Sequence, residues 1–489
     1  MHSSYPCRLF PYLCAASLAF SSCTVHPPAY TRPPAPIPAA YERGVSGDTV
    51  ADWRATGWQR YFADPGLRTL IRQALANNRD MRAAVLRVEE ARARYGIQHA
   101  DRLPEIDGQM QAERRRTARD LSLTGKADTN SAYQMSLGLV SWELDFWGRI
   151  RSLEAAALEE FLAGEAAQHA FAVSLVSEVA NTWLAQREYD QRIALTRQTI
   201  ASREESLRIF ARRYQVGYSS KLDLTQVQTL LIQARSLGAQ LEQERESNGH
   251  YLQFLVGGPV DLTPQLGVLD GKGGIRPVDP GLPSALLINR PDIVAAEHRL
   301  IAAQANINAA RAAFFPRIAL TGAMGLASSD LENLFESGNR VWNFMPVLSV
   351  PIFNGGRLRA NVDLAEVRHE QAVLDYERSI QQAFRDVADA LTAYHWLQQQ
   401  IVIKQEGLAT QEERSRLARL NYESGATTYL DVLDAERDLL QAAQDVISVQ
   451  RQLLSSQVNL FAALGGGPLG AAPGHAPGHY ANPLKAATP

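Results

Sequence analysis

The spacing of apolar residues along the chain changes several times, and each change predicts a boundary between elements. From about Leu67 to Asp101 apolar residues recur at helical spacing, which predicts one long helix ended by Pro104. At about residues 104–113 they alternate with polar residues, which predicts a strand with one apolar and one polar face. A second alternating run at about residues 133–143 completes a hairpin, and the polar stretch from Arg114 to Asn130 is predicted to connect the two strands.

Long helices are predicted after this hairpin. No proline occurs from Ile150 to about Tyr214, and roughly 65 helical residues would extend about 95–100 Å at 1.5 Å per residue. A shorter helix is predicted to return from Leu222 to about Leu255, where glycines and a proline end it.

The same order of elements then repeats. Alternating runs predict strands at about residues 316–326 and 342–352, and a second long run without proline follows them. The last helix is predicted from about Leu430 to Leu464, with an apolar heptad seam that is typical of supercoiled neighbouring helices. Its members are Leu433, Leu440, Ile447, Leu454 and Phe461. Each half of the chain is thus predicted to run helix, strand, strand, long helix, tip, helix.

A repeated glycine-containing stretch lies between the long helices. Its first copy contains Tyr214, Gly217, Leu222 and Asp223, which recur 208 positions later as Tyr422, Gly425, Leu430 and Asp431. In each copy a glycine that is free to adopt positive φ ends one helix, and Ser or Thr followed by Leu-Asp begins the next. Both stretches are therefore predicted to be the tips of helical hairpins.

The N-terminus resembles a bacterial export signal. Arg8 precedes an apolar run that ends in Ser21-Ser22-Cys23, which is typical of a signal peptide over residues 1–22. Cleavage there would make Cys23 the first residue, as in lipoproteins that carry acyl chains on this cysteine. The alternative is an ordinary signal peptide or a disordered N-terminus. No cysteine follows Cys23, so no disulfide framework is expected.

These observations predict the organisation of the whole chain. The proline-rich residues 23–52 would form a lipidated, extended tether. The predicted segments after it are a first structural repeat over residues 53–258, an equatorial connector over 259–285, a second repeat over 286–466 and a disordered tail over 467–489.

The alternating segments raise the question of a membrane. Beyond the leader no uninterrupted run of about 18 apolar residues occurs, so any membrane crossing would have to be made by strands. Spanning strands must close into a barrel of at least about eight, which four strands per chain cannot do and three copies can. Aromatic residues at both ends of the predicted strands agree with this interpretation. The alternative is a soluble β-sandwich with these aromatics in its core.

Charge and chemistry exclude several classes of function. The net charge of −3, without a basic stripe, gives no reason to expect nucleic acid as a partner. The ten histidines include no His-x-x-x-His on a predicted helix, and His475 and His479 lie in the tail that is predicted to be disordered. No nucleophile motif such as Gly-x-Ser-x-Gly occurs. We therefore expect neither an enzyme nor a metal or other cofactor, apart from the covalent lipid on Cys23.

Several local motifs resemble those of TolC-type outer membrane factors, and the leader makes the chain similar to the NodT/OprM-like outer membrane efflux lipoproteins. The resemblance covers about Trp53 to Gly466. It is carried by Asn77-Asn78-Arg79-Asp80, by the turns Trp147-Gly148-Arg149 and Gly355-Gly356-Arg357, and by the stretch from Tyr422 through Asp434 to Arg437.

The resemblance implies a fold, partners and a place in the cell. The fold would be mainly α with a transmembrane β-barrel: a homotrimer with a periplasmic α-barrel and a 12-stranded β-barrel to which each chain gives four strands. Its partners would be the other two copies, a periplasmic adaptor (membrane fusion) protein, an inner-membrane pump of the RND type or similar, and outer membrane lipid. The protein would be the gated exit duct of a tripartite efflux system in the bacterial outer membrane, lipid-anchored and with a large periplasmic extension.

The resemblance also implies roles for residues at the tips. Asp431 and Asp434 would form acidic rings across the three-fold axis of a periplasmic gate, and Leu430 an apolar constriction. Tyr422 and Arg437 would be interhelical partners in that gate. Thr427 stands where some relatives have an arginine that links the tips, so the closed-state latch differs here.

The first tip is expected to serve adaptor docking more than gating. Its residues for docking are Gly217, Leu222 and Asp223, together with Gly425 of the second tip. Gln226 replaces the second carboxylate in this copy, which makes equal gating by the two tips unexpected. The alternative role for each Leu-Asp pair is to complement the charge of a helix N-terminus.

Two other functions stay open from the sequence. The chain could be the outer-membrane conduit of a type I protein-secretion system, or a non-channel structural coiled-coil lipoprotein. The second alternative would explain the heptads but not the alternating strands.

Overall fold

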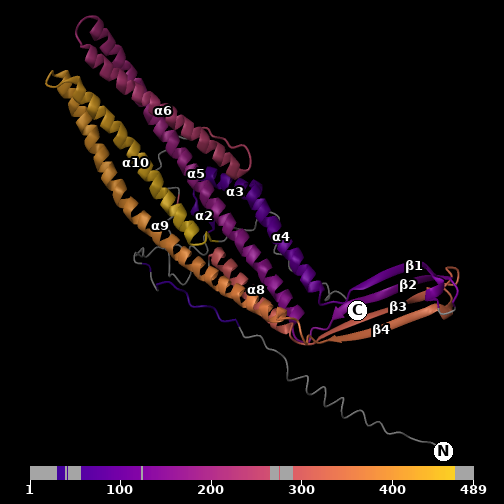
Figure 1. Ribbon diagram of the computed structural model, residues 1–489. Helices are drawn as coiled ribbons and strands as arrows, with labels where there is room; N and C mark the ends of the chain where they lie inside the picture. Colours follow the sequence, from indigo (N-terminus) through magenta and orange to yellow (C-terminus); the bar gives the residue numbers. More distant parts are fainter. Residues whose placement is uncertain are drawn as a thin grey trace, which may run out of the picture. The chain divides into compact units, whose positions relative to one another are not determined.

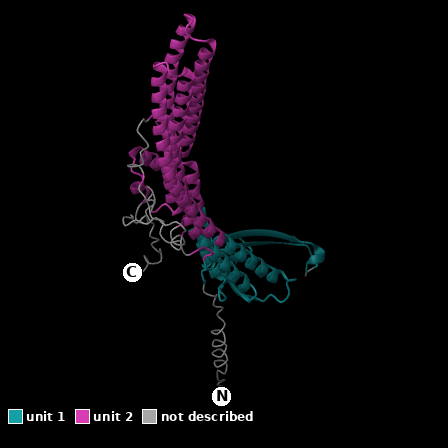
Figure 2. Cartoon of the chain, turned by 90° about the vertical axis from the view of Figure 1, so that its left-hand side faces the viewer, with its two compact units in different colours: residues 1–34, 88–164, 296–376 teal, residues 35–87, 165–295, 377–489 magenta. Residues whose placement is uncertain are grey.

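The computed structural model describes residues 30–38, 41, 57–122, 125–264, 275 and 290–467. The predicted signal peptide, Cys23, most of the equatorial connector and the tail after Gly467 lie outside these ranges. The chain divides into two compact units: residues 1–34, 88–164 and 296–376 form unit 1, and residues 35–87, 165–295 and 377–489 form unit 2 (Figure 2). Several long helices contribute to both.

The elements follow the predicted order twice (Figure 1). The first series is α2 (Trp58–Tyr61), α3 (Pro65–Asn77), α4 (Arg79–Ala100), β1 (Ile106–Thr117), η2 (Arg119–Leu121), β2 (Asp128–Glu143), α5 (Arg149–Gln215) and α6 (Lys221–Val256). The second is α8 (Pro291–Ala312), β3 (Arg317–Ser328), η4 (Ser337–Asn339), β4 (Arg340–Ser349), α9 (Arg357–Glu423) and α10 (Tyr429–Ala463). None of the described helices is long and apolar enough to span a membrane.

The two series match closely in length. Both α5 and α9 contain 67 residues, while α6 has 36 and α10 has 35. At 1.5 Å per residue each of the two longest helices extends about 100 Å. The predicted duplication is therefore present in the structure of the chain.

Unit 1 contains one antiparallel sheet in the order β1-β2-β3-β4. The first hairpin is longer than the sequence predicted, because Arg114–Thr117 pair in register with Asp128–Ser131. The prediction that residues 114–130 form only a connection was wrong for both ends of that stretch. The strands of the second hairpin differ from the predicted bounds by three residues or fewer.

The register of the sheet separates apolar from polar side chains, because directly paired residues project to the same face. One face, called here the apolar face, carries Ile106, Gly108, Met110, Ala112, Tyr133, Met135, Leu137, Leu139, Trp142, Ile318, Leu320, Gly322, Met324, Leu326, Trp342, Phe344, Pro346 and Leu348. Toward the loops the same face also carries Arg114, Arg116, Thr129, Ser131, Ser328 and Arg340. The opposite face carries Asp107, Gln109, Glu113 and Gln134 among others. The alternation predicted from the sequence is confirmed.

A bulge in β2 keeps this separation intact. Leu139 and Trp142 are three positions apart and would project to opposite faces of a regular strand. The register shifts between them, where Ser141 adopts a φ of 36°. The extra residue returns Trp142 to the apolar face, opposite Leu320 of β3.

The sheet is joined to its flanking helices by a buried charge cluster. The side chain of Glu143, at the end of β2, is only 10% exposed and lies 2.8 Å from Arg149 Nη2 and 2.6 Å from Arg317 Nε. It therefore connects the start of α5 to the start of β3. Beside it Trp147 stacks on Phe315, and Trp147 Nε1 donates to the carbonyl oxygen of Pro316 at 2.7 Å.

Unit 2 contains the hairpins α5/α6 and α9/α10, which run beside each other in Figure 1. The predicted single helix from Leu67 to Asp101 was wrong, because the chain breaks at Asn78 into α3 and α4. Asn78 Oδ1 accepts the backbone N–H of Met81 at 2.9 Å, and Asn78 Nδ2 donates to the carbonyl oxygen of Leu255 at 2.9 Å. A side chain that caps a helix start and is buried against α6 overrides the continuous helical pattern.

Part of the predicted tether is held against unit 1. Arg32 Nη2 lies 2.7 Å from Glu297 Oε2 of α8, and Arg32 Nε donates to Glu297 Oε1 at 2.7 Å. The hydroxyl of Tyr30 donates to the same carboxylate at 3.3 Å. This part of the segment is thus fixed by a bidentate ion pair in addition to its extended backbone.

Candidate functional site: the paired helix tips

The two tips have the same backbone structure. Gly217 and Gly425 adopt φ values of 81° and 78°, as the sequence predicted. The N–H of each glycine bonds to the carbonyl three residues earlier, and the next N–H bonds five residues back, from Tyr218 to Arg213 and from Ala426 to Asn421. This pair of bonds is a Schellman motif, and it depends on the left-handed glycine in both copies.

The helices that leave the tips are capped differently. Ser220 begins α6 with a capping box, in which its hydroxyl accepts the N–H of Asp223 at 3.0 Å while Asp223 Oδ2 accepts the N–H of Ser220 at 3.0 Å. Hydrogen bonds from Ser220 therefore lower the pKa of Asp223. Thr428 begins α10 without a side-chain bond to the backbone, and its hydroxyl donates to Asp431 Oδ2 at 3.3 Å. The carboxylate of Asp431 therefore takes less part in helix capping than that of Asp223, which accepts a backbone N–H.

An apolar cluster joins the two hairpins next to the tips. Phe210 of α5 and Leu224, Val227 and Leu230 of α6 are buried with Leu433 of α10. Tyr429 packs on this cluster, with its ring centroid 4.2 Å from that of Phe210 and 4.9 Å from that of Tyr422. The tips of one chain are therefore packed against each other.

Arg213 adds a polar contact between the same hairpins. Its guanidinium carbon lies 5.4 Å from the ring centroid of Phe210 and 5.8 Å from that of Tyr422. Arg213 Nη1 also donates to the hydroxyl of Tyr422. The interhelical partner of Tyr422 within the chain is thus an arginine of the first tip. Burial of Tyr429 beside it raises the pKa of that phenol.

The predicted gate residues lie together on α10. Leu430 is 45% exposed at the first turn. Asp431 and Asp434 line one groove of about 760 Å³ between α9 and α10. Thr427 and Arg414 line the same groove. The two aspartates therefore face one common space.

The ion pairs of Arg437 within the chain are made along its own helix. Arg437 Nη1 lies 3.1 Å from Asp434 Oδ1, and Arg437 Nη2 lies 3.1 Å from Asp438 Oδ1. Asp438 also lies 2.6 Å from Arg414 Nη1 of α9, and the hydrogen bond from Arg414 lowers the pKa of Asp438. Asp434 is thereby connected through Arg437 and Asp438 to the neighbouring helix.

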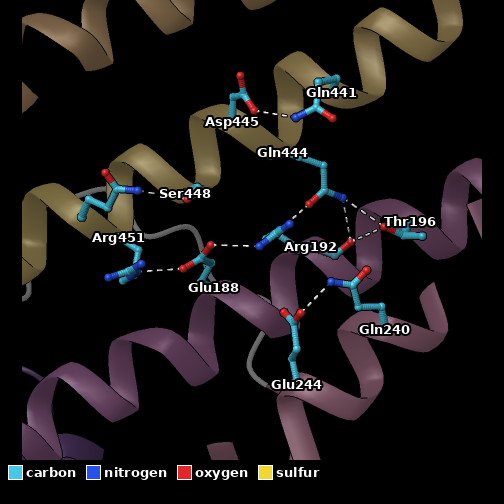
Figure 3. A network of polar contacts seen from close by, with 11 residues as sticks. Glu188, Arg192, Thr196, Gln240, Glu244, Gln441, Gln444, Asp445, Ser448 and Arg451 are labelled. Carbon is cyan, nitrogen blue, oxygen red and sulfur yellow. Dashed lines mark hydrogen bonds and ion pairs between the residues drawn. The ribbon is translucent and has the colours of Figure 1, made fainter. Parts of the chain in front are cut away.

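Farther along the same helices a buried polar network joins α5 to α10 (Figure 3). Glu188 accepts from Arg192 at 3.2 Å and from Arg451 of α10 at 2.8 Å. Gln444 of α10 accepts from Arg192 Nε at 2.5 Å and donates to the hydroxyl of Thr196 at 3.0 Å. Glu188 and Gln444 are each only 4% exposed. Loss of one partner from such a buried charge network costs about 3–5 kcal/mol, so the two hairpins are firmly joined here.

The sequence reasoning missed Arg213 and this network. The duplication contained a signal for the first of them, because Arg213 and Asn421 occupy equivalent positions just before the two tip tyrosines. The charge at only one of two equivalent positions indicates a contact specific to one tip. Glu188 and Arg192 are spaced four residues apart, as many exposed helix pairs are, and this spacing does not reveal burial.

No metal centre is evident in the described part of the chain, where no group of three or more His, Cys, Asp or Glu could hold an ion.

The family model of outer membrane efflux proteins matches residues 70–258 and 282–466. The chain belongs to the outer membrane efflux protein family. The two matched ranges correspond to the two series of elements.

Individual relatives of this family cover nearly the whole chain. The solvent efflux pump outer membrane protein SrpC of Pseudomonas putida is 42% identical over 92% of this chain and 97% of its own length. The cation efflux system protein CusC of Escherichia coli K12 is 38% identical over 94% of this chain and 100% of its own. The fold is similar to the open state of the MtrE outer membrane channel of Neisseria gonorrhoeae, with a TM-score of 0.83 and 35% identity over 91% of this chain and 99% of that one.

These comparisons confirm the predicted family, fold class and function. The protein is an outer membrane efflux channel, mainly helical with one antiparallel sheet, and its structural neighbours are trimeric channels that combine an α-barrel with a β-barrel. Its predicted partners, a periplasmic adaptor and an inner-membrane pump, and its outer-membrane location are confirmed as well. Members of the family are channels, as the resemblance implied.

The unequal capping of the tips gives a testable difference between them. Ser220→Ala removes an N-cap worth about 1 kcal/mol, so amide exchange at residues 222–224 is expected to become about 5-fold faster. Thr428→Ala is the matched control, and exchange at residues 430–432 should change by less than about 2-fold. Hydrogen–deuterium exchange with mass spectrometry on the assembled channel measures both. Equal acceleration at the two tips would contradict the assignment.

Proposed function

We propose that the second tip is the periplasmic gate of the efflux channel. The observation that carries this proposal is the position of Asp431 and Asp434, which line one groove, with carboxylates outside any capping box. In a trimer these residues occur three times around the axis, and like charges brought close repel unless cations or basic side chains pair with them. Such a ring favours cations, and the cations or basic side chains that pair with it hold the closed state together. Leu430 would supply the apolar constriction beside it.

Release of the gate requires that the second tip separates from the first. The contacts to be broken within a chain are the packing of Tyr429 on Phe210 and the bond from Arg213 to Tyr422. Both lie at the tips, whereas the buried network of Glu188 and Gln444 joins the same hairpins farther along. The proposed motion is therefore limited to the segment of α9/α10 between that network and the tip.

We further propose that the first tip docks the periplasmic adaptor. Its turn exposes apolar side chains, with Tyr218 86% and Leu222 65% accessible. The carboxylate of Asp223 is engaged in the capping box, which fixes the shape of this turn. A rigid, exposed and partly apolar turn suits a partner that recognises shape. Gly217 and Gly425 supply the backbone geometry on which both tips depend.

Substrate selection is proposed to lie outside this conduit. Relatives with 42% and 38% identity to this chain are named for the efflux of solvents and of cations, respectively. Apolar solvents and metal cations share no chemistry that one channel wall could recognise. The inner-membrane pump is the component that would choose the cargo.

We also propose that Cys23 carries a covalent lipid. The cysteine follows an apolar leader and precedes a proline-rich segment of the kind that spans from a lipid to a folded body. The bidentate pair between Arg32 and Glu297 would fix that segment nine residues after the acylated cysteine. The lipid would be the only non-protein group that the chain requires.

The gate assignment is tested by neutralising both aspartates. Asp431→Asn with Asp434→Asn removes the charge ring and the ion pair of Asp434 with Arg437, so the closed state is weakened. Single-channel conductance in planar bilayers is expected to rise by about 2-fold or more, with reduced preference for cations. Asp223→Asn is the control and should leave conductance unchanged. Unchanged conductance in the double variant would exclude this gate.

The lipid anchor is tested by Cys23→Ser. The variant is expected to lose all incorporation of radioactive palmitate, because no other cysteine would follow the leader cleavage point. Metabolic labelling followed by gel autoradiography measures this, with the wild-type chain as the positive control. Palmitate labelling that persists in the variant would refute acylation at Cys23.

A further inference from the structure

The apolar face of the sheet carries an unusual distribution of charge. Its only charged side chains in the described strands are Arg114, Arg116 and Arg340, and every acidic residue of the strands projects to the other face. Arg114 and Arg116 lie near the loop end of β1. Arg340 begins β4 at the opposite edge of the sheet and is level with Met110 of β1 through the paired residues Leu326 and Met135. A face that is apolar along most of its length therefore ends in positive charge.

The order of side chains along β1 and β2 shows where the apolar part of this face ends and the positive charge begins. Ala112 pairs with Tyr133, and the next pairs toward the loop are Arg114 with Ser131 and Arg116 with Thr129. Tyrosine is enriched where a membrane meets water. Arg114 and Arg116 are the next residues of this face after the pair of Ala112 and Tyr133. They are about 7 Å apart along β1, at the depth where lipid headgroups lie.

Among the residues that the structure describes, these arginines have no partner of opposite charge. All three are exposed, and no carboxylate among the described residues lies within ion-pair distance of Arg114, Arg116 or Arg340. Arg115 provides the contrast, because it projects to the polar face and its Nη2 lies 2.6 Å from Glu113 Oε1. The charge on the apolar face is thus left available to an external anion.

An apolar groove lies beside one of these arginines. It measures about 620 Å³ and is lined by Met110, Met135, Leu137, Met324, Trp342 and Arg340 among others. Methionines adapt their shape to flexible apolar partners. Arg114 follows Met110 of the groove by four residues, about 13 Å along β1, which is within the length of an acyl chain. A lipid whose chain lies in this groove would therefore extend its headgroup toward Arg114 and Arg116.

We propose that Arg114 and Arg116 form a binding site for a phosphate-bearing anionic lipid of the outer leaflet. The planar guanidinium donates two parallel hydrogen bonds to phosphate, and two arginines about 7 Å apart on one face suit a headgroup with more than one phosphate. The hydroxyls of Ser131 and Thr129 lie opposite Arg114 and Arg116 and add donors. The lipid would cover the apolar groove with its acyl chains.

Binding of phosphate at this site would offset the destabilisation that charged side chains cause on a lipid-facing surface. Charged side chains on the lipid-facing side of a β-barrel destabilise it when they are buried in hydrocarbon, and less so near the interface. Two arginines in three positions at the end of a lipid-facing strand are tolerated there, and binding phosphate makes them favourable. The inference rests on the membrane placement of the sheet and is independent of the proposed gate.

Native mass spectrometry of the detergent-purified full-length trimer tests the site. The probes are a bisphosphorylated glycolipid, the same glycolipid without phosphates, and phosphatidylethanolamine. The wild-type channel is expected to bind the bisphosphorylated lipid most tightly, and Arg114→Gln should weaken this binding by about 5-fold. Arg115→Gln is the matched control, with the same loss of charge one position away on the opposite face, and it should change binding by less than about 2-fold.

The double variant with Arg114 and Arg116 changed to Gln should bind the phosphorylated and unphosphorylated glycolipids equally. Equal weakening by Arg114→Gln and Arg115→Gln would overturn the site, because it would reflect net charge alone. Full displacement of the lipid by millimolar inorganic phosphate would also overturn it, in favour of a simple anion site. Conductance in bilayers separates this proposal from the gate proposal. If neutralising Asp431 and Asp434 raises conductance while the wild-type channel shows no preference among the lipids, the lipid site alone is excluded.

Discussion

The unpaired edges of a four-stranded sheet are the constraint on which the rest of this structure depends. β1 and β4 each have a neighbour on one side only, so half of their backbone groups lack a partner within the chain. An unsatisfied backbone group in hydrocarbon costs several kcal/mol, and the exposed apolar face of the sheet belongs in hydrocarbon. Pairing β4 of one copy with β1 of the next satisfies both edges, and with three copies the ring closes. Association of several copies is therefore required by the strands. Three copies, the number found in the structural neighbours, would arrange the tips around a three-fold axis.

The second feature of the architecture is the internal duplication. The two copies differ at a few residues, and these differences give the two tips different roles. Both tips keep the glycine and the Schellman bonds, so both hairpins turn in the same way. Ser220 then closes a capping box that Thr428 does not, and Arg213 has a charge that Asn421 lacks. The first tip thereby becomes a rigid turn that also contacts Tyr422, and the second retains carboxylates that are outside any capping box. One repeated unit can in this way provide both a docking surface and a movable gate.

Periodicity predicted the fold well, because a two-residue or a 3.6-residue repeat directly reflects which side is buried. The failures were local and had local causes. Asn78 breaks a continuous helical pattern through side-chain bonds to Met81 and Leu255, and the latter is 177 residues away. β1 extends through three arginines that composition assigns to a loop, since pairing with β2 decides strand length. At the site, the positions of Asp431 and Asp434 on one helix were predictable, whereas the contact of Arg213 with Tyr422 depends on packing between distant segments.

Disulfide cross-linking between copies tests the central claim most directly, because the chain has no cysteine after Cys23. Met110→Cys in β1 would be combined in turn with Trp342→Cys, Phe344→Cys or Leu348→Cys in β4, all on the apolar face. If β4 of each copy pairs with β1 of the next, oxidation of outer membranes should give covalent dimers and trimers on denaturing gels for at least one combination. Chains with only one introduced cysteine should give no product larger than a dimer. Monomers alone for every combination, in membranes where the channel is active, would contradict a barrel closed by these two edges.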